Sequence, residues 1–295
     1  MFVIAISNCI AQSGVQGFFK PSDTLNTKRK NAVFISEAAV STVALVGLNQ
    51  LWYADYPRSK FHFINDNKDW LQMDKAGHVY SSYHLGRLSS EMLEWSGLSP
   101  KKQLIYGSGF GFAFLTAVEV LDGFSSQWGA STGDVIANAT GTALYVSQEL
   151  IWKEQRITPK FSFHTTRFAK YRPELLGKTF NEQILKDYNG QTYWLSANLK
   201  SFFKSSKIPK ILNLAIGYGG DGMLGEKGEN SLEIDAQNRL KSRQFYLSLD
   251  LDLTKIETKS HFLKTFFSVF SVLKIPAPTL EYSANEGFRT HLLYF

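Results

Sequence analysis

The feature that most constrains this chain is a set of polar residues on segments that otherwise have the composition of buried helices. They form three pairs, spaced three or four residues apart: Asp74 and His78, Glu119 and Asp122, and Asp134 and Asn138. Residues at these spacings share one face of a helix. A carboxylate is costly to bury without a partner. We therefore expect three helices to present their polar pairs to one shared centre.

Composition sets the broad class of the protein. The chain has 295 residues, of which 44% are hydrophobic and 20% charged, so it is globular with a sizeable core. Aromatic residues make up 14%, which fits contact with an apolar or interfacial surface. The net charge of +6 is spread along the chain, and no nucleic-acid motif accompanies it. We expect a membrane surface, and no nucleic acid, as partner; the charge can also simply favour solubility.

The first residues are typical of an export signal. Residues 1–11 are largely apolar and end in a small residue before Gln12, which predicts a signal peptide cleaved after Ala11. Cys9, the only cysteine, is an alternative lipid anchor, although Asn8 is unfavourable before a lipidated cysteine. A short buried N-terminal strand is the other alternative. We expect an exported protein that is periplasmic or associated with the outer membrane.

A helical region follows a linker of residues 12–30. The expected helices cover Asn31–Tyr53, Asp74–Trp95, Lys101–Leu121 and Ser131 to about Gln155. The third contains glycines at two-residue spacing, and the fourth has small residues at four-residue spacing, which allow helices to approach closely. Residues 31–158 are therefore expected to form a bundle, either in or against a membrane or as an ordinary buried core.

The pattern changes to β after Pro159. Residues 243–256 alternate between apolar and polar side chains, residues 212–218 repeat this over a shorter length, and residues 280–294 resemble a hairpin. An amphipathic helix is expected over His261–Lys274. The predicted fold is thus α+β, with a bundle of about four helices followed by a small antiparallel sheet, residues 159–295, packed on it. The aromatic C-terminus suggests a closed outer-membrane barrel as an alternative. Such barrels need at least eight strands, and the sequence predicts only about five.

The polar pairs suggest chemistry. One imidazole with several carboxylates can hold a divalent cation or perform acid–base catalysis, and it can equally form a self-satisfied network that fixes packing. The candidate catalytic residues are His78, Glu119 and Asp122. The candidate metal ligands are Asp74, His78, Glu119, Asp122 and Asp134, with Asn138 in the polar network. Asp134 also follows Ser131 at capping-box spacing, so a structural role explains it as well.

Three motifs carry a resemblance to a known family. They are the segments 74–78 (DKAGH), 119–123 (EVLDG) and 128–138 (WGASTGDVIAN). They resemble the YfiM-like predicted periplasmic lipoproteins, an uncharacterised domain, over roughly residues 30–155. Their order is also similar to that of VanZ-like membrane proteins. The resemblance implies an envelope location and supports the six polar residues as motif positions, and it implies no reaction.

These observations leave three functional hypotheses. The first is a membrane-associated, non-enzymatic envelope protein that binds or organises a lipid or cell-wall component. The second is a metal-assisted hydrolase that acts on a lipid-linked or cell-wall substrate. The third is an accessory of outer-membrane assembly, and whether the chain is an enzyme stays open.

Overall fold

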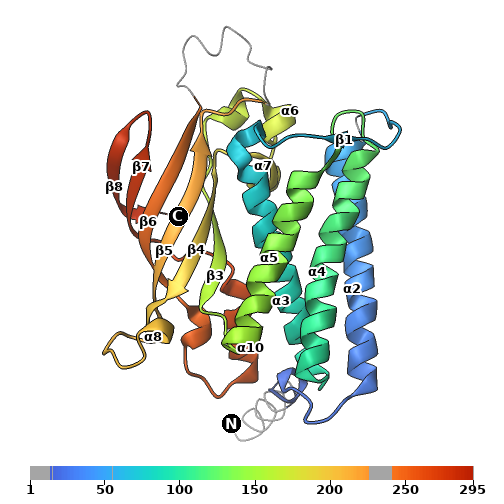
Figure 1. Ribbon diagram of the computed structural model, residues 1–295, viewed down its shortest axis with the longest axis vertical. Helices are drawn as coiled ribbons and strands as arrows, with labels where there is room; N and C mark the ends of the chain where they lie inside the picture. The colour runs from blue at the N-terminus through green and yellow to red at the C-terminus, as the bar shows by residue number, and fades with distance from the viewer. Residues whose placement is uncertain (1–13, 15, 55, 226–240, 295) are drawn as a thin grey trace, which may run out of the picture.

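A computed structural model describes residues 14, 16–54, 56–225 and 241–294. In it, long helices lie beside a six-stranded antiparallel sheet (Figure 1), which confirms the predicted α+β class. The predicted signal peptide, with Cys9, lies outside the described residues.

The long helices run along the longest axis of the molecule (Figure 1). They are α2 (Thr27–Leu48), α3 (Met73–Trp95), α4 (Pro100–Gly123) and α5 (Thr132–Ile151). Helix α3 is central, because it packs against the other three. Its approach to α4 requires glycine, since a Cβ on Gly111 would lie only 2.7 Å from the Gly86 nitrogen. The small residues noted in the sequence therefore set the spacing of the helices around the site.

Several helix boundaries differ from the prediction, including the end of α5 at Ile151 instead of about Gln155. Helix α2 begins inside the predicted linker, because the Asn26 side chain caps it by accepting a hydrogen bond from the Arg29 N–H at 3.1 Å. It continues into a π-helical turn, Asn49–Tyr53. Helix α4 continues past the predicted end at Leu121 to Gly123, because the Asp122 carboxylate accepts a hydrogen bond from Tyr53 instead of building a local turn.

Short elements connect the helices and the sheet. They are β1 (Phe63–Ile64), η2 (Asp69–Gln72), β2 (Ala130–Ser131), η3 (Phe168–Lys170), α6 (Pro173–Leu176), α7 (Phe180–Lys186), α8 (Leu199–Phe202) and η4 (Leu253–Lys255). Strands β1 and β2 form a small parallel pair beside the site. Helix α10 covers His261–Phe270, which is shorter than predicted because residues 272–274 instead run beside the first strand of the sheet.

The six strands pair in chain order. They are β3 (Ile157–Phe163), β4 (Gln191–Asn198), β5 (Leu212–Asp221), β6 (Ser242–Leu251), β7 (Ala277–Ser283) and β8 (Gly287–Tyr294). Strands β3 and β4 were not predicted, because neither has a clear alternation of apolar and polar residues in the sequence. Strand β3 starts at Ile157, before the expected boundary, and it tolerates Pro159 because it is an edge strand.

The sheet curls around a polar face. Lys160 on β3 and Asp250 on β6 are three strands apart, about 14 Å in a flat sheet, yet Lys160 Nζ lies 2.7 Å from Asp250 Oδ2. On the opposite, outer face, Tyr80 of α3 packs against Phe161 and Tyr193, with ring centroids 5.8 Å apart in both pairs. The helices therefore cover the β3–β4 side of the outer face, and the polar side chains fill the inside of the curl.

The buried pair inside the sheet generates a stability prediction. Both side chains are at most 1% exposed, and buried Lys274 lies 4.0 Å from the same carboxylate, so removing the charge of Asp250 leaves two buried lysines unpaired. We expect Asp250→Asn to lower the free energy of unfolding by about 3–5 kcal/mol in urea titrations followed by tryptophan fluorescence. Glu257→Gln is the control, because its pair with Lys210 is exposed, and it should leave the unfolding midpoint unchanged. Equal midpoints for all three proteins would contradict the prediction.

Candidate functional site

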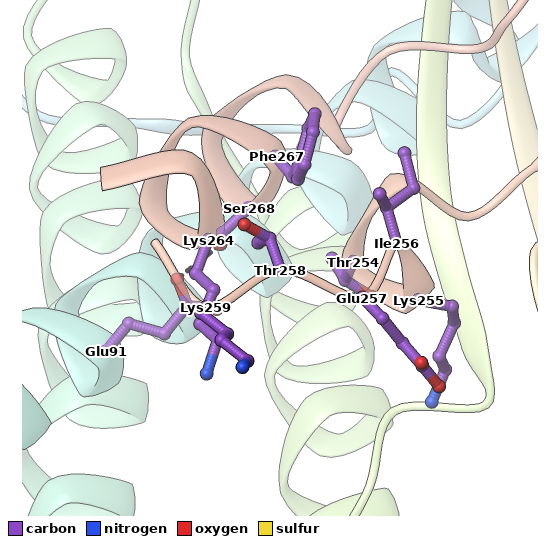
Figure 2. A pocket seen from close by; sticks show the side chains of 10 residues that line it. All are labelled: Glu91, Thr254, Lys255, Ile256, Glu257, Thr258, Lys259, Lys264, Phe267 and Ser268. Carbon is purple, nitrogen blue, oxygen red and sulfur yellow. Dashed lines mark hydrogen bonds between the residues drawn. The ribbon is translucent and has the colours of Figure 1, made fainter. Parts of the chain in front are cut away.

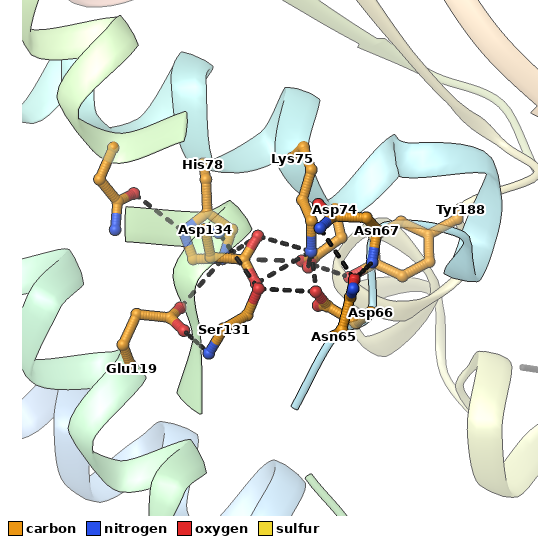
Figure 3. A network of polar contacts seen from close by, with 11 residues as sticks. Asn65, Asp66, Asn67, Asp74, Lys75, His78, Glu119, Ser131, Asp134 and Tyr188 are labelled. Atoms are coloured by element: carbon orange, nitrogen blue, oxygen red, sulfur yellow. Dashed lines mark hydrogen bonds and ion pairs between the residues drawn. The ribbon is translucent and has the colours of Figure 1, made fainter. Parts of the chain in front are cut away.

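The site lies at the end of the helical layer where α3 and α5 begin and α4 ends (Figures 1 and 3). Five of the six residues selected from the sequence meet there: Asp74, His78, Glu119, Asp134 and Asn138. They come from three different helices. The shared helix faces expected from the three- and four-residue spacings are therefore brought to one centre.

His78 occupies the middle of this centre. Its Nδ1 lies 2.9 Å from the amide oxygen of Asn138, which can only accept, so Nδ1 carries the hydrogen. Its Nε2 then points toward three carboxylate oxygens (Figure 3). They are Glu119 Oε1 at 3.5 Å, Asp74 Oδ1 at 3.6 Å and Asp134 Oδ1 at 4.0 Å.

This arrangement requires a proton or a cation beside Nε2. A nitrogen lone pair that faces three carboxylates is repelled by them, so either a proton or a metal cation has to lie between. Burial lowers the pKa of His78, but the negative charges of Asp74, Asp134 and Glu119 outweigh it, and the pKa is raised overall. In the absence of a metal, the site therefore favours imidazolium.

Lys75 supplies a fixed positive charge beside His78. Its Nζ contacts three aspartates: Asp66 at 2.5 Å, Asp134 at 2.9 Å and Asp74 at 3.4 Å. Burial lowers the pKa of Lys75, but these carboxylates raise it overall, so it stays protonated. Four carboxyl groups, those of Asp66, Asp74, Glu119 and Asp134, thus surround two cationic groups, Lys75 and His78, so the site holds more acidic than basic groups.

Ser131 fixes two of the carboxylates. As the N-cap of α5, its Oγ accepts a hydrogen bond from Asp134 N–H at 3.2 Å, while its own N–H donates to Glu119 Oε2 at 3.1 Å. Its hydroxyl also donates to Asp66. The other oxygen of Glu119, Oε1, accepts no hydrogen bond from the described residues, although the side chain is only 4% exposed. A buried acceptor in this state calls for a ligand.

Asp122 has a different environment from the other five residues. Its carboxylate accepts a hydrogen bond from Tyr53 at 2.6 Å, and no hydrogen bond or ion pair joins it to His78 within the described chain. By contrast, one ligand atom each from Asp74, His78 and Asp134 lies within 4.8 Å of the other two. Asp122 therefore lies in the wall of the cleft, while the other three form the compact group.

The polar centre opens into a cleft of about 220 Å³. Its walls include the aromatic side chains of Trp52, Tyr53, Trp70, Trp128 and Tyr188. The cleft therefore combines a charged floor with apolar walls, which is the usual composition of a small-molecule site.

Sequence reasoning missed several residues of the site. Asp66 lies in a segment that has the composition of a turn, and Lys75 was treated only as a spacer between Asp74 and His78. Tyr188 donates a hydrogen bond to Asp74 Oδ1 at 3.1 Å from 114 residues away, and no sequence pattern points to that contact. It links the second half of the chain to the site.

The backbone before α3 is strained. Trp70, Leu71 and Gln72 have φ values of 46°, 52° and 67°, a conformation that non-glycine residues rarely adopt. The hydroxyl of Tyr218 on β5 donates a hydrogen bond to the Leu71 carbonyl. This strained segment places the Trp70 ring at the cleft, and such strain clusters at functional sites.

Comparison with known proteins agrees with the location of the site. A family model described as a predicted periplasmic lipoprotein (DUF2279) matches residues 61–148, less than a third of the chain. The compact group lies inside this range, whereas the curled sheet lies outside it. No curated protein matches the chain, and no solved structure does. The match supports an exported, uncharacterised protein of the cell envelope, and the finer YfiM-like and VanZ-like resemblances stay predictions.

The proton balance of the site gives a pH prediction. Burial and the charge of Asp74 raise the pKa of Asp134 despite Lys75, so folding adds a proton to Asp134 and to His78. Such groups stabilise the folded chain at low pH and lose this contribution as pH rises. We measure the Tm of the wild type minus the Tm of Asp134→Asn, both in EDTA. We expect this difference to decrease as the pH rises from about 4 to about 8. Thermal melts followed by circular dichroism test this, and a difference that grows with pH would contradict it.

Proposed function

We propose that this chain is a membrane-associated protein of the cell envelope that holds a divalent cation at Asp74, His78 and Asp134. Through that cation it binds a polar group of a lipid or cell-wall component in the cleft. The observation that carries the proposal is the orientation of His78, whose Nδ1 is fixed by Asn138 while Nε2 faces three carboxylate oxygens.

The donor set supports a cation. Metal-bound histidines usually donate their second ring N–H to an oxygen acceptor, which is the role Asn138 fills here. Ligands at about 2.0–2.2 Å from a metal lie roughly 3.0–3.6 Å from one another. His78 Nε2 lies 3.6 Å from Asp74 and 4.0 Å from Asp134, and the whole group spans at most 4.8 Å, so a metal would have to draw these ligands closer together. One imidazole with carboxylates suits Zn²⁺ or Mn²⁺, and a double positive charge offsets most of the excess negative charge.

The cleft supports an amphiphilic ligand. A bare acidic floor repels an anionic headgroup, whereas a cation on that floor attracts its oxygen atoms. The rings of Trp52, Trp70 and Trp128 line the approach, and aromatic side chains of this kind favour the boundary between water and lipid. A lipid or lipid-linked cell-wall component meets both requirements.

Metal binding is tested directly by elemental analysis of the purified full chain after dialysis against Zn²⁺ or Mn²⁺. We expect one ion per chain in the wild type and loss of that ion in His78→Ala and Asp74→Asn. Asp69→Asn is the matched control, because Asp69 lines the same cleft but lies outside the compact group. Asp122→Asn tests whether Asp122 is a metal ligand. Because we place Asp122 in the wall of the cleft, this variant should keep the metal. No bound metal in the wild type, or equal loss in Asp69→Asn, would refute the site.

Glu119 favours a second candidate, a metal-assisted hydrolase. Its Oε1 is buried, accepts no hydrogen bond in the described chain, and lies 3.5 Å from His78 Nε2. A carboxylate in that place can take a proton from a water molecule that a cation polarises. The assembly-accessory hypothesis stays a prediction, since no feature of the described residues bears on it.

Glu119→Gln separates binding from hydrolysis. The amide keeps the size of the side chain but removes the base, so we expect unchanged metal content in elemental analysis. In a hydrolase, turnover of a lipid-linked or cell-wall substrate should fall by about a hundredfold or more. If the wild type binds metal and envelope lipid without turnover, the hydrolase candidate fails and the binding function stands.

A further inference from the structure

The outer face of the curled sheet has a polarity that water-soluble sheets do not show. We propose that the part of the outer face that the helices leave uncovered, from Leu195 on β4 across to β7, lies among the acyl chains of a bilayer that contains anionic lipid. The sheet then enters the membrane, beside α2 and α4. This inference deepens the proposed membrane association and rests on it.

The two faces of the sheet are inverted relative to a soluble protein. Along β6, Tyr246, Ser248 and Asp250 are at most 4% exposed and point into the curl, whereas Phe245 and Leu247 are 49% and 44% exposed. The same holds for the neighbouring strands. The exposed apolar residues of the outer face are Leu195, Leu214, Ile216, Phe245, Leu247, Leu249, Leu280 and Tyr282. Alternation of apolar outside and polar inside is the pattern of a sheet that faces lipid.

The interior can remain polar without bulk water. Asp250 is paired with Lys160, and its carboxylate also accepts a hydrogen bond from Ser196 at 2.6 Å. Thr279 and Ser248 bond to each other at 2.8 Å. Strands β4–β7 each have a neighbouring strand on both sides, so most of their backbone groups are paired within the sheet. A hydrocarbon environment demands this pairing.

The dimensions match a bilayer. Strands β5 and β6 have ten residues each, about 33 Å of extended chain, and the hydrocarbon core of a bilayer is about 30 Å thick. The helices run along the same axis as the strands (Figure 1). Two of them, Thr27–Tyr53 and Pro100–Gly123, are long and apolar enough to cross a membrane. On the first, Val40 and Val43 are 67% and 72% exposed.

One end of the molecule is basic. The starts of α2 and α4, the loop after α8 and the segment before α10 all lie at the end opposite the acidic site (Figure 1). The bases of these segments and of α10 are Lys28, Arg29, Lys30, Lys101, Lys102, Lys204, Lys207, Lys210, Lys255, Lys259 and Lys264. Two of them are paired with glutamates, Lys210 with Glu257 and Lys255 with Glu154. Figure 2 shows Lys255, Lys259 and Lys264 around a hollow at this end. Lys259 and Lys264 form no ion pair with the part of the chain that the structure describes. Anionic headgroups complement this end.

Spin labels locate the outer face directly. The full chain, with Cys9→Ser, is reconstituted into phosphatidylcholine vesicles that contain phosphatidylglycerol. Labels are placed at Ile216→Cys and Leu247→Cys on the outer face, and at Lys178→Cys as an exposed control. Collision with oxygen, which dissolves in lipid, is compared with collision with a water-soluble nickel chelate.

We expect oxygen to dominate at the two sheet positions and nickel to dominate at the control. Nickel access at the sheet positions would overturn the inference, and so would exclusion of both reagents, which would indicate a second copy on this face. Flotation of the same samples tests the proposed membrane association separately from the inserted sheet. If the chains float with the vesicles but the sheet labels are exposed to water, only the inserted sheet is refuted. If the chains do not float with these vesicles or with vesicles of pure phosphatidylcholine, the proposed membrane association is refuted.

Variants at the basic end test whether it binds anionic lipid. Lys259→Gln with Lys264→Gln should weaken binding to phosphatidylglycerol vesicles about thirtyfold and leave binding to pure phosphatidylcholine unchanged. The matched control is Lys170→Gln with Lys178→Gln, which removes two exposed charges near the other end. An equal effect in the two double variants would overturn the part of the proposal that assigns anionic lipid to this end.

Discussion

Buried charges can exist in this protein only because each is matched by an opposite charge or a dense set of hydrogen bonds. Inside the sheet, Lys160 neutralises Asp250 across three strands, and this pair holds the curl. At the helix ends, Lys75 holds three aspartates together, but it does not balance them. The pair of Lys160 and Asp250 is therefore structural. The acidic group around Lys75 is a candidate site, because it leaves negative charge that a ligand can neutralise.

The same constraint explains how the two halves of the chain depend on each other. The helical half supplies the compact acidic group, and the second half supplies two tyrosine hydroxyls, one that binds an acidic residue and one that binds the segment before α3. Tyr188 holds Asp74, and Tyr218 holds the strained segment that leads into α3. Because Trp70, Leu71 and Gln72 adopt an unfavourable backbone conformation, such external contacts have to stabilise it.

Periodicity carried most of the predictable information. It gave the α+β class, the long helices and the shared faces of the pairs Asp74–His78 and Asp134–Asn138, because spacing along a helix is a local property. It failed where distant contacts decide the outcome. Asp122 satisfied the same spacing rule but turned toward Tyr53, and β3 and β4 lacked a pattern strong enough to recognise. Alternation in residues 243–256 revealed two different faces, but it did not reveal which one the curl encloses.

The contact between Tyr188 and Asp74 has a consequence for how far the family match can be extended. The matched range, residues 61–148, contains every member of the compact acidic group but neither tyrosine that braces it. A related chain that ends where the match ends would share the ligands yet lack the clamp. In such a relative, Asp74 would keep Lys75 and His78 as neighbours but lose the hydrogen bond from Tyr188, so the affinity of the site for a cation would depend on how far this side chain moves.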